Sequence, residues 1–270
     1  MKKGVIYKDM KYSTQVKFLK ATNEMYKLYN KGFVFSALYG SQNYGLATPT
    51  SDVDVKCAFL PAPRDVLLME KRMAYTHTEN GSTDNTVLAK DLRDVFNEFY
   101  KQNLNFLEVL ATPYFVVEPP YAEMMNELRK RSNEVARYYE RGFYLCTCGL
   151  FNKLDADFQK RRIDKKKFTF GLYLRDFMNK YSNGVEFKDC FESENKNFYT
   201  SVRLADSDNF VERYNCKGDY HELWYEAKAD MREYFTKAQC MSQTKNDNTH
   251  KWMDELLYDC VWKYVVLEGR

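Results

Sequence analysis

The chain has 270 residues, of which 44% are hydrophobic and 29% charged, and this composition excludes a disordered or fibrous protein. The 41 basic and 38 acidic residues leave a net charge of +3, which is too small to indicate nucleic-acid binding by itself. The chain opens with MKKGVIYKDMKY, which has no apolar signal core, and it contains no run of about 18 apolar residues. We therefore expect a soluble, cytoplasmic protein without a membrane segment.

The first part of the chain alternates helical and strand-like segments. Apolar residues recur at helical intervals between positions 13 and 30 and predict a helix there. The run Phe33–Gly40 is rich in aromatic and β-branched residues, which indicates a buried strand. The segment Asp52–Pro61 begins with alternating polar and apolar residues, so we expect a second strand with one polar face. Further along, the pattern predicts a strand over 83–89, a helix over 91–102 and a short apolar strand over 105–112.

Prolines at positions 113, 119 and 120 mark the end of the part in which helices and strands alternate. Beyond them the pattern is mainly helical, with an irregular polar segment over 186–217. We therefore predict a mixed α/β domain over residues 1–115 and a mainly helical domain over residues 116–270. The helices expected in the second domain cover 121–144, 146–160, 166–181, 220–239 and 251–267.

The stretch GSQNYGLATPTSDVDV, residues 40–55, carries the chemistry. Gly40 and Ser41 stand at the end of a buried strand and just before a short expected helix. Glycine permits a close backbone approach, and a helix N-terminus offers free N–H groups and a positive dipole end to a phosphate. The hydroxyl of Ser41 can add one more donor, so this turn is a candidate phosphate site.

Asp52 and Asp54 are two residues apart on the expected second strand, so both carboxylates project from one face. Two such anions repel each other unless a cation lies between them. Mg²⁺, or Mn²⁺ in its place, suits this arrangement because it takes a few carboxylates together with phosphate and water. A pair of metal ions there would stabilise both an attacking hydroxyl and a leaving pyrophosphate.

These residues carry a resemblance to a known family. The segment resembles the G-S-x-x-x-G-…-S-D-x-D signature of the DNA polymerase β superfamily of nucleotidyltransferases. It is most similar to the predicted YcgL-like nucleotidyltransferases of bacteria and large phages. The resemblance implies an α+β fold, in which a mixed sheet flanked by helices is followed by a mainly helical C-terminal domain. The residues that fit the signature are Gly40, Ser41, Tyr44, Gly45, Leu46, Ala47, Thr48, Pro49, Ser51, Asp52 and Asp54.

The resemblance also implies a third metal carboxylate on a later strand, with a role in catalysis. Glu108, in the segment Asn103–Leu110, lies about fifty residues after the aspartates and fits that place. A carboxylate in an apolar strand is costly unless it is paired or metal-bound. The alternatives are that Glu108 is an exposed residue on an edge strand, or that Asp84 has the third role.

Basic residues are candidates for contacts to the nucleotide. Lys56 shares a strand face with Asp54, where it either screens the acidic residues or is an ordinary surface lysine. Relatives of the family resembled here carry a basic helix in the second half, and Lys167 and Arg175 occupy a comparable place, although the histidine of that helix is absent. The two residues either bind the triphosphate or are solvated helix charges.

Six of the eight residues from Lys160 to Lys167 are basic. Concentrated charge of this kind can guide a polyanion such as RNA, although charge runs are usually solvated faces. The sequence thus predicts a metal-dependent nucleotidyltransferase that moves an NMP from an NTP to an acceptor hydroxyl and releases pyrophosphate. The acceptor is left open between an RNA or tRNA end, a protein and a small molecule, and the sequence gives no indication of the oligomeric state. The alternative is a catalytically inactive nucleotide- or RNA-binding module of the same fold.

Overall fold

The computed structural model describes residues 4–5, 11–29, 32–68, 74–78, 86–205 and 219–268. Within these ranges the strands are β1 (Gly4–Val5), β2 (Phe33–Tyr39), β3 (Asp54–Phe59), β4 (Ala74–Thr78), β5 (Thr86–Asp91) and β6 (Phe115–Val117). The α-helices are α1 (Tyr12–Tyr29), α2 (Pro63–Leu67), α3 (Leu92–Tyr100), α4 (Leu104–Leu107), α5 (Ala122–Lys130), α6 (Ser132–Ala136), α7 (Glu140–Gln159), α8 (Lys165–Ser182), α9 (Lys196–Leu204), α11 (Asp219–Cys240) and α12 (Asp247–Val261). Short helices of other types are η2 (Gly40–Gln42), η4 (Glu108–Leu110), η5 (Pro119–Tyr121), η6 (Phe187–Phe191) and η8 (Trp262–Leu267).

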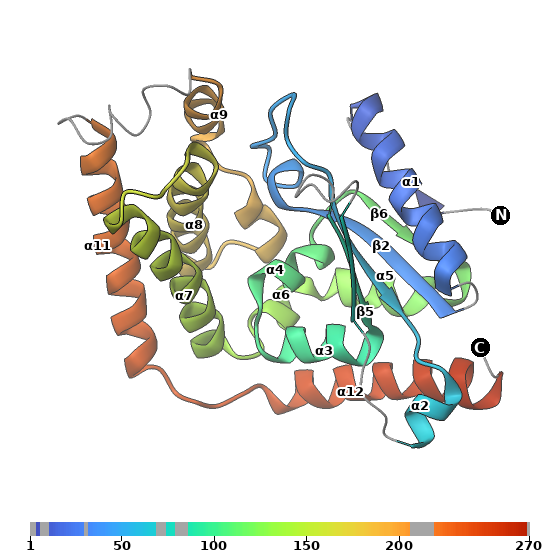
Figure 1. Cartoon of the computed structure of the whole chain (residues 1–270). Coiled ribbons are helices and arrows are strands. Elements are labelled where there is room, and N and C mark those ends of the chain that lie inside the picture. The colour runs from blue at the N-terminus through green and yellow to red at the C-terminus, as the bar shows by residue number, and fades with distance from the viewer. Residues whose placement is uncertain are drawn as a thin grey trace.

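The strands form one mixed sheet in the order β1-β6-β2-β3-β5-β4. Strand β3 lies at its centre, antiparallel to β2 and parallel to β5. Helix α1 covers one face of the sheet, where Phe18 and Met25 pack on alternate residues of the strands (Figure 1). The other face packs on the remaining helices, so the fold is α+β as predicted.

The helical half is built on α7, α8 and α11, which pack against one another. Gly171 of α8 lets the ring of Trp224 on α11 come close, because a methyl group at Gly171 would lie 2.5 Å from that ring. Helix α12 then returns along α3, where the hydroxyl of Tyr100 donates to Asp254 at 2.6 Å (Figure 1). The last segment of the chain therefore rests on the sheet half.

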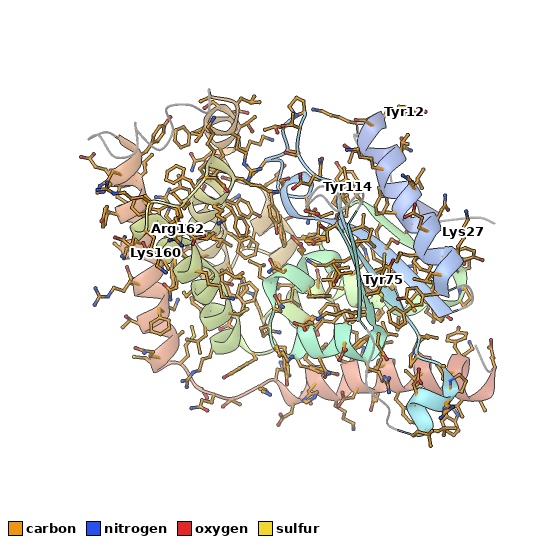
Figure 2. All side chains as sticks on the ribbon, viewed as in Figure 1. Tyr12, Lys27, Tyr75, Tyr114, Lys160 and Arg162 are labelled. Carbon is orange, nitrogen blue, oxygen red and sulfur yellow. The ribbon has the colours of Figure 1, made fainter. Side chains whose placement is uncertain are left out.

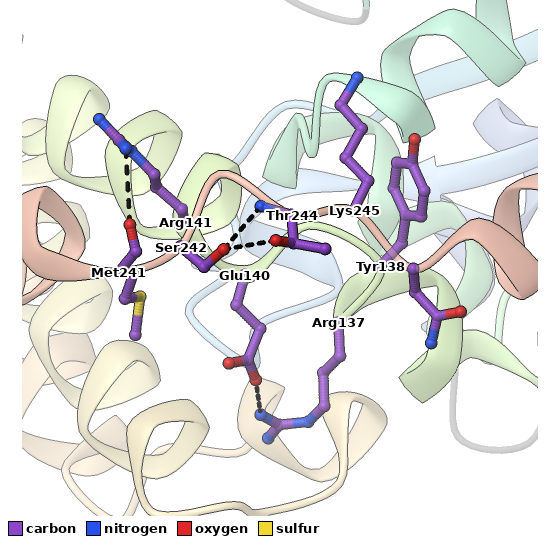
Figure 3. Close-up of a pocket in the computed structure, with 9 residues that line it drawn as sticks. Arg137, Tyr138, Glu140, Arg141, Met241, Ser242, Thr244 and Lys245 are labelled. Atoms are coloured by element: carbon purple, nitrogen blue, oxygen red, sulfur yellow. Dashed lines mark hydrogen bonds and ion pairs between the residues drawn. The ribbon is translucent and has the colours of Figure 1, made fainter.

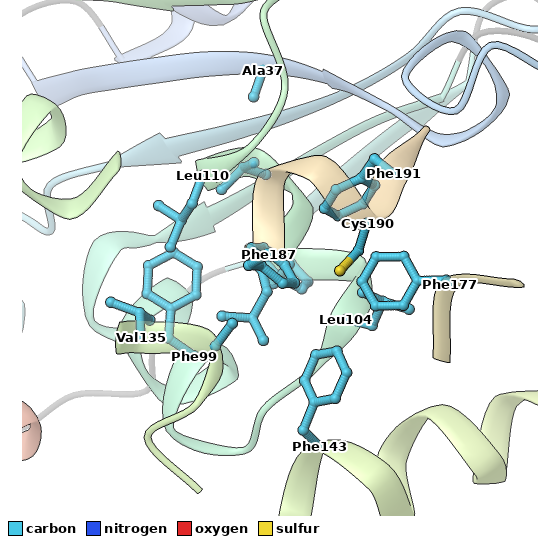
Figure 4. Packing of buried hydrophobic residues seen from close by; sticks show 14 of the residues in the cluster. Ala37, Phe99, Leu104, Leu110, Val135, Phe143, Phe177, Phe187, Cys190 and Phe191 are labelled. Carbon is cyan, nitrogen blue, oxygen red and sulfur yellow. The ribbon is translucent and has the colours of Figure 1, made fainter. Parts of the chain in front are cut away.

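One apolar core joins the sheet to the helical half. Figure 4 shows Ala37 of β2, Phe99 of α3 and Phe187 of η6 within it, and all three are buried. The predicted boundary at about residue 115 falls at the start of β6, which pairs with β2 in the sheet. The division into two domains stays a prediction.

Several elements match the sequence prediction closely, but the segment 105–112 does not. It is helical, forming α4 and η4 rather than a strand, because the side chain of Asn103 accepts a hydrogen bond from the backbone N–H of Asn105 and caps a helix there. The expected helix over 121–144 is divided among α5, α6 and the start of α7. The segment predicted to be irregular contains η6 and α9. None of the helices in the described ranges has the length and apolar character that a membrane crossing requires.

Candidate active site

The chain leaves β2 through a tight turn that touches β3. Tyr39, the last residue of β2, pairs with Asp54, the first residue of β3. Gly40 then has φ +76°, a backbone conformation that favours glycine. A methyl group at Gly40 would lie 3.7 Å from Oδ2 of Asp54, so the turn and this carboxylate are neighbours.

The predicted helix after Gly40 and Ser41 is a single 3₁₀ turn, η2. The first N–H groups of such a turn have no acceptor within it. No hydrogen bond from the hydroxyl of Ser41 occurs within the described ranges. Ser41 therefore keeps a donor beside Asp54, as a phosphate site requires.

The loop between η2 and β3 is closed by its own hydrogen bonds. The N–H of Thr48 donates to the hydroxyl of Ser51 at 2.8 Å, and the N–H of Ser51 donates to the carbonyl of Thr48 at 3.0 Å. The side-chain amide of Gln42 reaches the carbonyl of Asp52 at 3.3 Å. These bonds hold Asp52 beside the turn that precedes the loop.

Asp54 opens β3, whereas Asp52 lies two residues before the strand rather than on it. The backbone N–H of Thr86 donates to Oδ1 of Asp54 at 3.1 Å, which fixes one edge of that carboxylate. Burial raises the pKa of the Asp54 carboxyl, and the negative charge of Asp52 raises it further. The two carboxylates are thus near enough to interact, although they do not share a strand as the sequence analysis expected.

A lysine that the sequence analysis did not select contacts this pair. Lys166, in the first turn of α8, places its ammonium group on Oδ2 of Asp52. The lysine side chain is 57% exposed and that of Asp52 is 19% exposed. An ammonium ion is therefore the counter-charge of Asp52 in this structure. The basic run was the signal for it, but only the docking of α8 determines which lysine reaches the aspartate.

Arg203 of α9 forms a second link between the helices and the loop. Its guanidinium group donates to the carbonyl of Leu46 at 2.8 Å and to the hydroxyl of Thr169 at 2.7 Å. Burial lowers the pKa of Arg203 to about 10, so the group is positively charged at neutral pH. This residue was also missed from the sequence, since its partners lie in two distant segments.

The other basic candidates in the second half pair elsewhere. Lys167 donates to Asp157 at 2.7 Å, and Arg175 contacts Asp176 at 3.2 Å. Within the described ranges, neither forms an ion pair with the two aspartates beside the turn. Lys160 and Arg162 are exposed on the helical side of the molecule (Figure 2).

Glu108 and Lys56 lie beneath the turn. Glu108 is 0% exposed and Lys56 is 2% exposed, so neither the exposed-edge interpretation of Glu108 nor the surface-lysine interpretation of Lys56 is correct. The two side chains form an ion pair at 3.0 Å. Burial raises the pKa of the Glu108 carboxyl and lowers that of the Lys56 ammonium, and the contact between them opposes both shifts. Asp84, the rival for the third carboxylate, lies outside the described residues.

The chemistry of the pair Asp52 and Asp54 fits a divalent metal. Two neighbouring carboxylates, one with an oxygen facing the turn, are the kind of oxygen ligands that Mg²⁺ accepts together with phosphate and water. In the part of the chain that the structure describes, no three His, Cys, Asp or Glu side chains gather closely enough to hold an ion. The described residues therefore bring two candidate metal carboxylates together, and both their metal role and a third carboxylate stay predictions.

A cavity of about 380 Å³ lies between the start of α7 and the segment 241–246 (Figure 3). It contains none of the site residues predicted from the sequence. The guanidinium of Arg137 donates to Glu140 at 2.9 Å and to the carbonyls of Tyr181 and Val185. Much of the polar lining is thus bonded within the protein, and we do not include this cavity in the candidate active site.

The family of the chain follows from its similarity to known proteins. No curated protein matches the sequence. Among solved structures, a nucleotidyltransferase-like protein from Exiguobacterium sibiricum 255-15 has 12% sequence identity and a TM-score of 0.30, covering 81% of this chain and 74% of that one. The model of the family described as "RlaP: RNA repair pathway DNA polymerase beta family" matches residues 10–145, which is half of the chain and includes the turn, both aspartates and Glu108. The chain therefore belongs to the RNA repair pathway DNA polymerase β family.

Proposed function

We propose that the protein transfers a nucleoside monophosphate from an NTP to a hydroxyl group of RNA, with Mg²⁺ or Mn²⁺ bound by Asp52 and Asp54. One observation carries this proposal. Two carboxylates lie against a glycine-serine turn with φ +76° at Gly40, and the charge of one of them is balanced by an ammonium ion. A protein that only binds nucleotides has no need of two neighbouring anions, whereas a phosphoryl-transfer enzyme needs them to bind metal.

Different residues around the turn bind the phosphates and balance their charge. The hydroxyl of Ser41 and the N–H groups that follow Gly40 in the turn hold the phosphates of the NTP, and Gly40 permits their close approach. When bound, the metal would neutralise charge on the reacting phosphate and on the pyrophosphate that leaves. Lys166 is able to exchange Asp52 for a phosphate oxygen, because a surface ion pair of this kind is held weakly.

The reaction balances as a single displacement. The acceptor oxygen bonds to the α-phosphorus while the bond from that phosphorus to the bridging oxygen breaks, and pyrophosphate leaves. The acceptor proton passes to a water molecule of the solvent. Catalysis comes mainly from alignment and from stabilisation of charge.

RNA is the acceptor class we favour. The matching family is described by its place in an RNA repair pathway. The basic run Lys160–Lys167 supplies charge that attracts a phosphate backbone, and it contains Lys166, which contacts Asp52. The run therefore leads from the exposed helical surface to the proposed catalytic residues.

The test is incubation with each labelled NTP, Mg²⁺ and total RNA, followed by identification of the labelled product. We expect label in RNA, and a loss of about a thousandfold or more in rate for Asp52→Asn and for Asp54→Asn. Asp259→Asn, on the exposed surface of α12, is the matched control and should keep the wild-type rate. Near-normal turnover by either site variant would overturn the assignment.

Two other outcomes would change the proposed acceptor or the proposed activity. Label in protein or in a small molecule, with the same loss in both site variants, would retain the reaction and change the acceptor. Binding of NTP without any metal-dependent turnover would instead identify an inactive nucleotide-binding module.

A further inference from the structure

Glu108 is held by donors from two separate parts of the chain. The hydroxyl of Tyr44 donates to its Oε2, and Lys56 donates to its Oε1 at 3.0 Å. The backbone N–H of Gly40 also hydrogen-bonds to the same carboxylate. Burial raises the pKa of Tyr44 well above its usual value, so the phenol keeps the proton that it donates. Both oxygens of Glu108 are thus occupied from within the protein.

Lys56 is satisfied in the same way. Besides Glu108, its ammonium group donates to the carbonyl of Asn105, and it lies 3.5 Å from the centre of the Tyr39 ring. A lysine has three donors, and these three partners use them. Lys56 therefore has no donor left for a nucleotide.

This arrangement argues against Glu108 as a metal ligand. An ion at Glu108 would share a carboxylate that already accepts from three donors, and it would stand beside the positive charge of Lys56. Asp52 and Glu108 also have different counter-charges, since Asp52 meets the exposed Lys166 and Glu108 meets the buried Lys56. The exposed counter-charge can leave, whereas the buried one is fixed.

The hydrogen bonds of Glu108 enclose the proposed phosphate turn. Gly40 and Tyr44 stand on either side of Ser41, and both donate to the one carboxylate. The ring of Tyr44 also stacks on Tyr173 of α8, with 4.6 Å between ring centres. The turn is thereby fixed both to the sheet and to the helical half.

We propose that Glu108 and Lys56 are positioning residues, a buried ion pair that holds the turn from Gly40 to Tyr44 in the form that binds the phosphates. This inference rests on the proposed function and replaces the metal role of Glu108 with a structural one. A turn held in this way presents its donors to the triphosphate without rearrangement. The assignment follows from the hydrogen bonds and the burial of the two side chains.

Metal affinity and phosphate affinity should respond differently to changes at the buried pair. The probes are Mn²⁺ alone, followed by electron paramagnetic resonance, and inorganic tripolyphosphate at saturating Mg²⁺, followed by calorimetry. For Glu108→Gln we expect wild-type Mn²⁺ affinity and a loss of about tenfold in tripolyphosphate affinity. Asp54→Asn should instead lose about tenfold or more in Mn²⁺ affinity.

Restoration by a second substitution tests the ion pair. Glu108→Gln leaves the buried ammonium without its anion, so the Tm should fall. Adding Lys56→Met removes that uncompensated charge, and the double variant should recover most of the decrease in Tm. A metal ligand would show no such recovery.

A milder change keeps the test valid if Glu108→Gln does not fold. Tyr44→Phe removes only the hydroxyl that donates to Glu108, and it should weaken tripolyphosphate binding while Mn²⁺ affinity is unchanged. Tyr173→Phe, which removes a buried hydroxyl from the same ring stack, is the matched control and should bind tripolyphosphate as the wild type does.

The outcomes distinguish the two proposals. Equal losses of Mn²⁺ affinity in Glu108→Gln and Asp54→Asn would overturn the positioning role and leave the enzymatic function standing. Unchanged Mn²⁺ affinity in Asp54→Asn would contradict the proposed function itself, whatever Glu108 does.

Discussion

The sheet half and the helical half of the molecule use charge in opposite ways. In the sheet half, Lys56 and Glu108 are almost completely buried, and they bond to each other and to the surrounding chain. In the helical half, the side chains of two lysines in the first turn of α8 are exposed, with Lys166 at 57% and Lys167 at 44%. A buried pair keeps one geometry, whereas an exposed pair exchanges readily with solvent and contributes little to stability. Under the proposed function, the sheet half would fix the positions of the reacting groups, and the helical half would supply mobile positive charge for the substrate.

The largest effect is expected at Arg203, a partly buried residue of the helical half that bonds to the loop before β3. Arg203→Met removes the bonds to Leu46 and Thr169, and we expect a loss of about 2 kcal/mol in the free energy of unfolding. Thermal denaturation measures it. The matched control is Arg232→Met on the exposed face of α11, which should leave the Tm unchanged. Equal stability of the two variants would show that Arg203 does not link the halves.

The next test compares two neighbouring lysines of α8. Lys166→Met should raise the KM for NTP by about tenfold with a smaller change in kcat, because the exposed ammonium is able to meet the triphosphate. Lys167→Met should have a smaller effect, since Lys167 pairs with Asp157. Steady-state kinetics of the two variants shows which lysine contributes more to NTP binding. A larger effect at Lys167 would support the triphosphate contact that the sequence analysis suggested for it.

The dependence of protein stability on pH tests the environment of Asp54 in the sheet half. Its carboxyl pKa is raised above the unfolded value of 3.8, so the folded metal-free protein binds this proton more tightly than the unfolded chain. The cost in stability therefore grows as the pH rises from 3.8 through the raised pKa of Asp54, and Asp54→Asn should raise the Tm of the metal-free protein at neutral pH. Mn²⁺ binding should weaken as the pH falls through the same pKa. Melting curves from pH 4 to 8 for both proteins, without metal, check the first point, and a Tm difference that does not change with pH would refute it.

The smallest effect is expected from the exposed basic run. Replacing Lys160, Arg161 and Arg162 together by glutamine should lower the slope of log K against log salt for RNA binding by about 0.7 for each phosphate that is no longer neutralised. The rate of transfer at saturating RNA should stay the same. An unchanged salt slope would mean that RNA approaches from another surface.

Much of the proposed catalytic region could be predicted because its pattern is local. Gly40 must adopt a positive φ, and the two aspartates are two positions apart, so the turn and the acidic pair are visible in one short segment. The register of β2 on β3 then brings Gly40 beside Asp54, as the resemblance to the polymerase β superfamily implies.

The remainder depends on interactions between distant segments. The segment around Glu108 has the apolar character of a strand, but the side chain of Asn103 caps a helix there, and this cap overrides the pattern. Which of three consecutive lysines reaches Asp52 is decided by the rotation of α8 against the sheet, which no local pattern encodes. Arg203 was missed for the same reason, since Leu46 lies 157 positions away in the chain.

One further consequence follows from the hydrogen bond between Thr86 and Asp54. The donor is a main-chain N–H of the parallel neighbour strand, so the orientation of this carboxylate is encoded in strand register and not in any side chain. Among substitutions at position 86, proline alone would delete this donor. With Oδ1 tied to the backbone, Oδ2 is the oxygen left to approach a metal, and it already faces Gly40. The pairing of β3 with β5 therefore determines the side from which an ion can bind Asp54. This side should stay the same when the side chains around the carboxylate are changed.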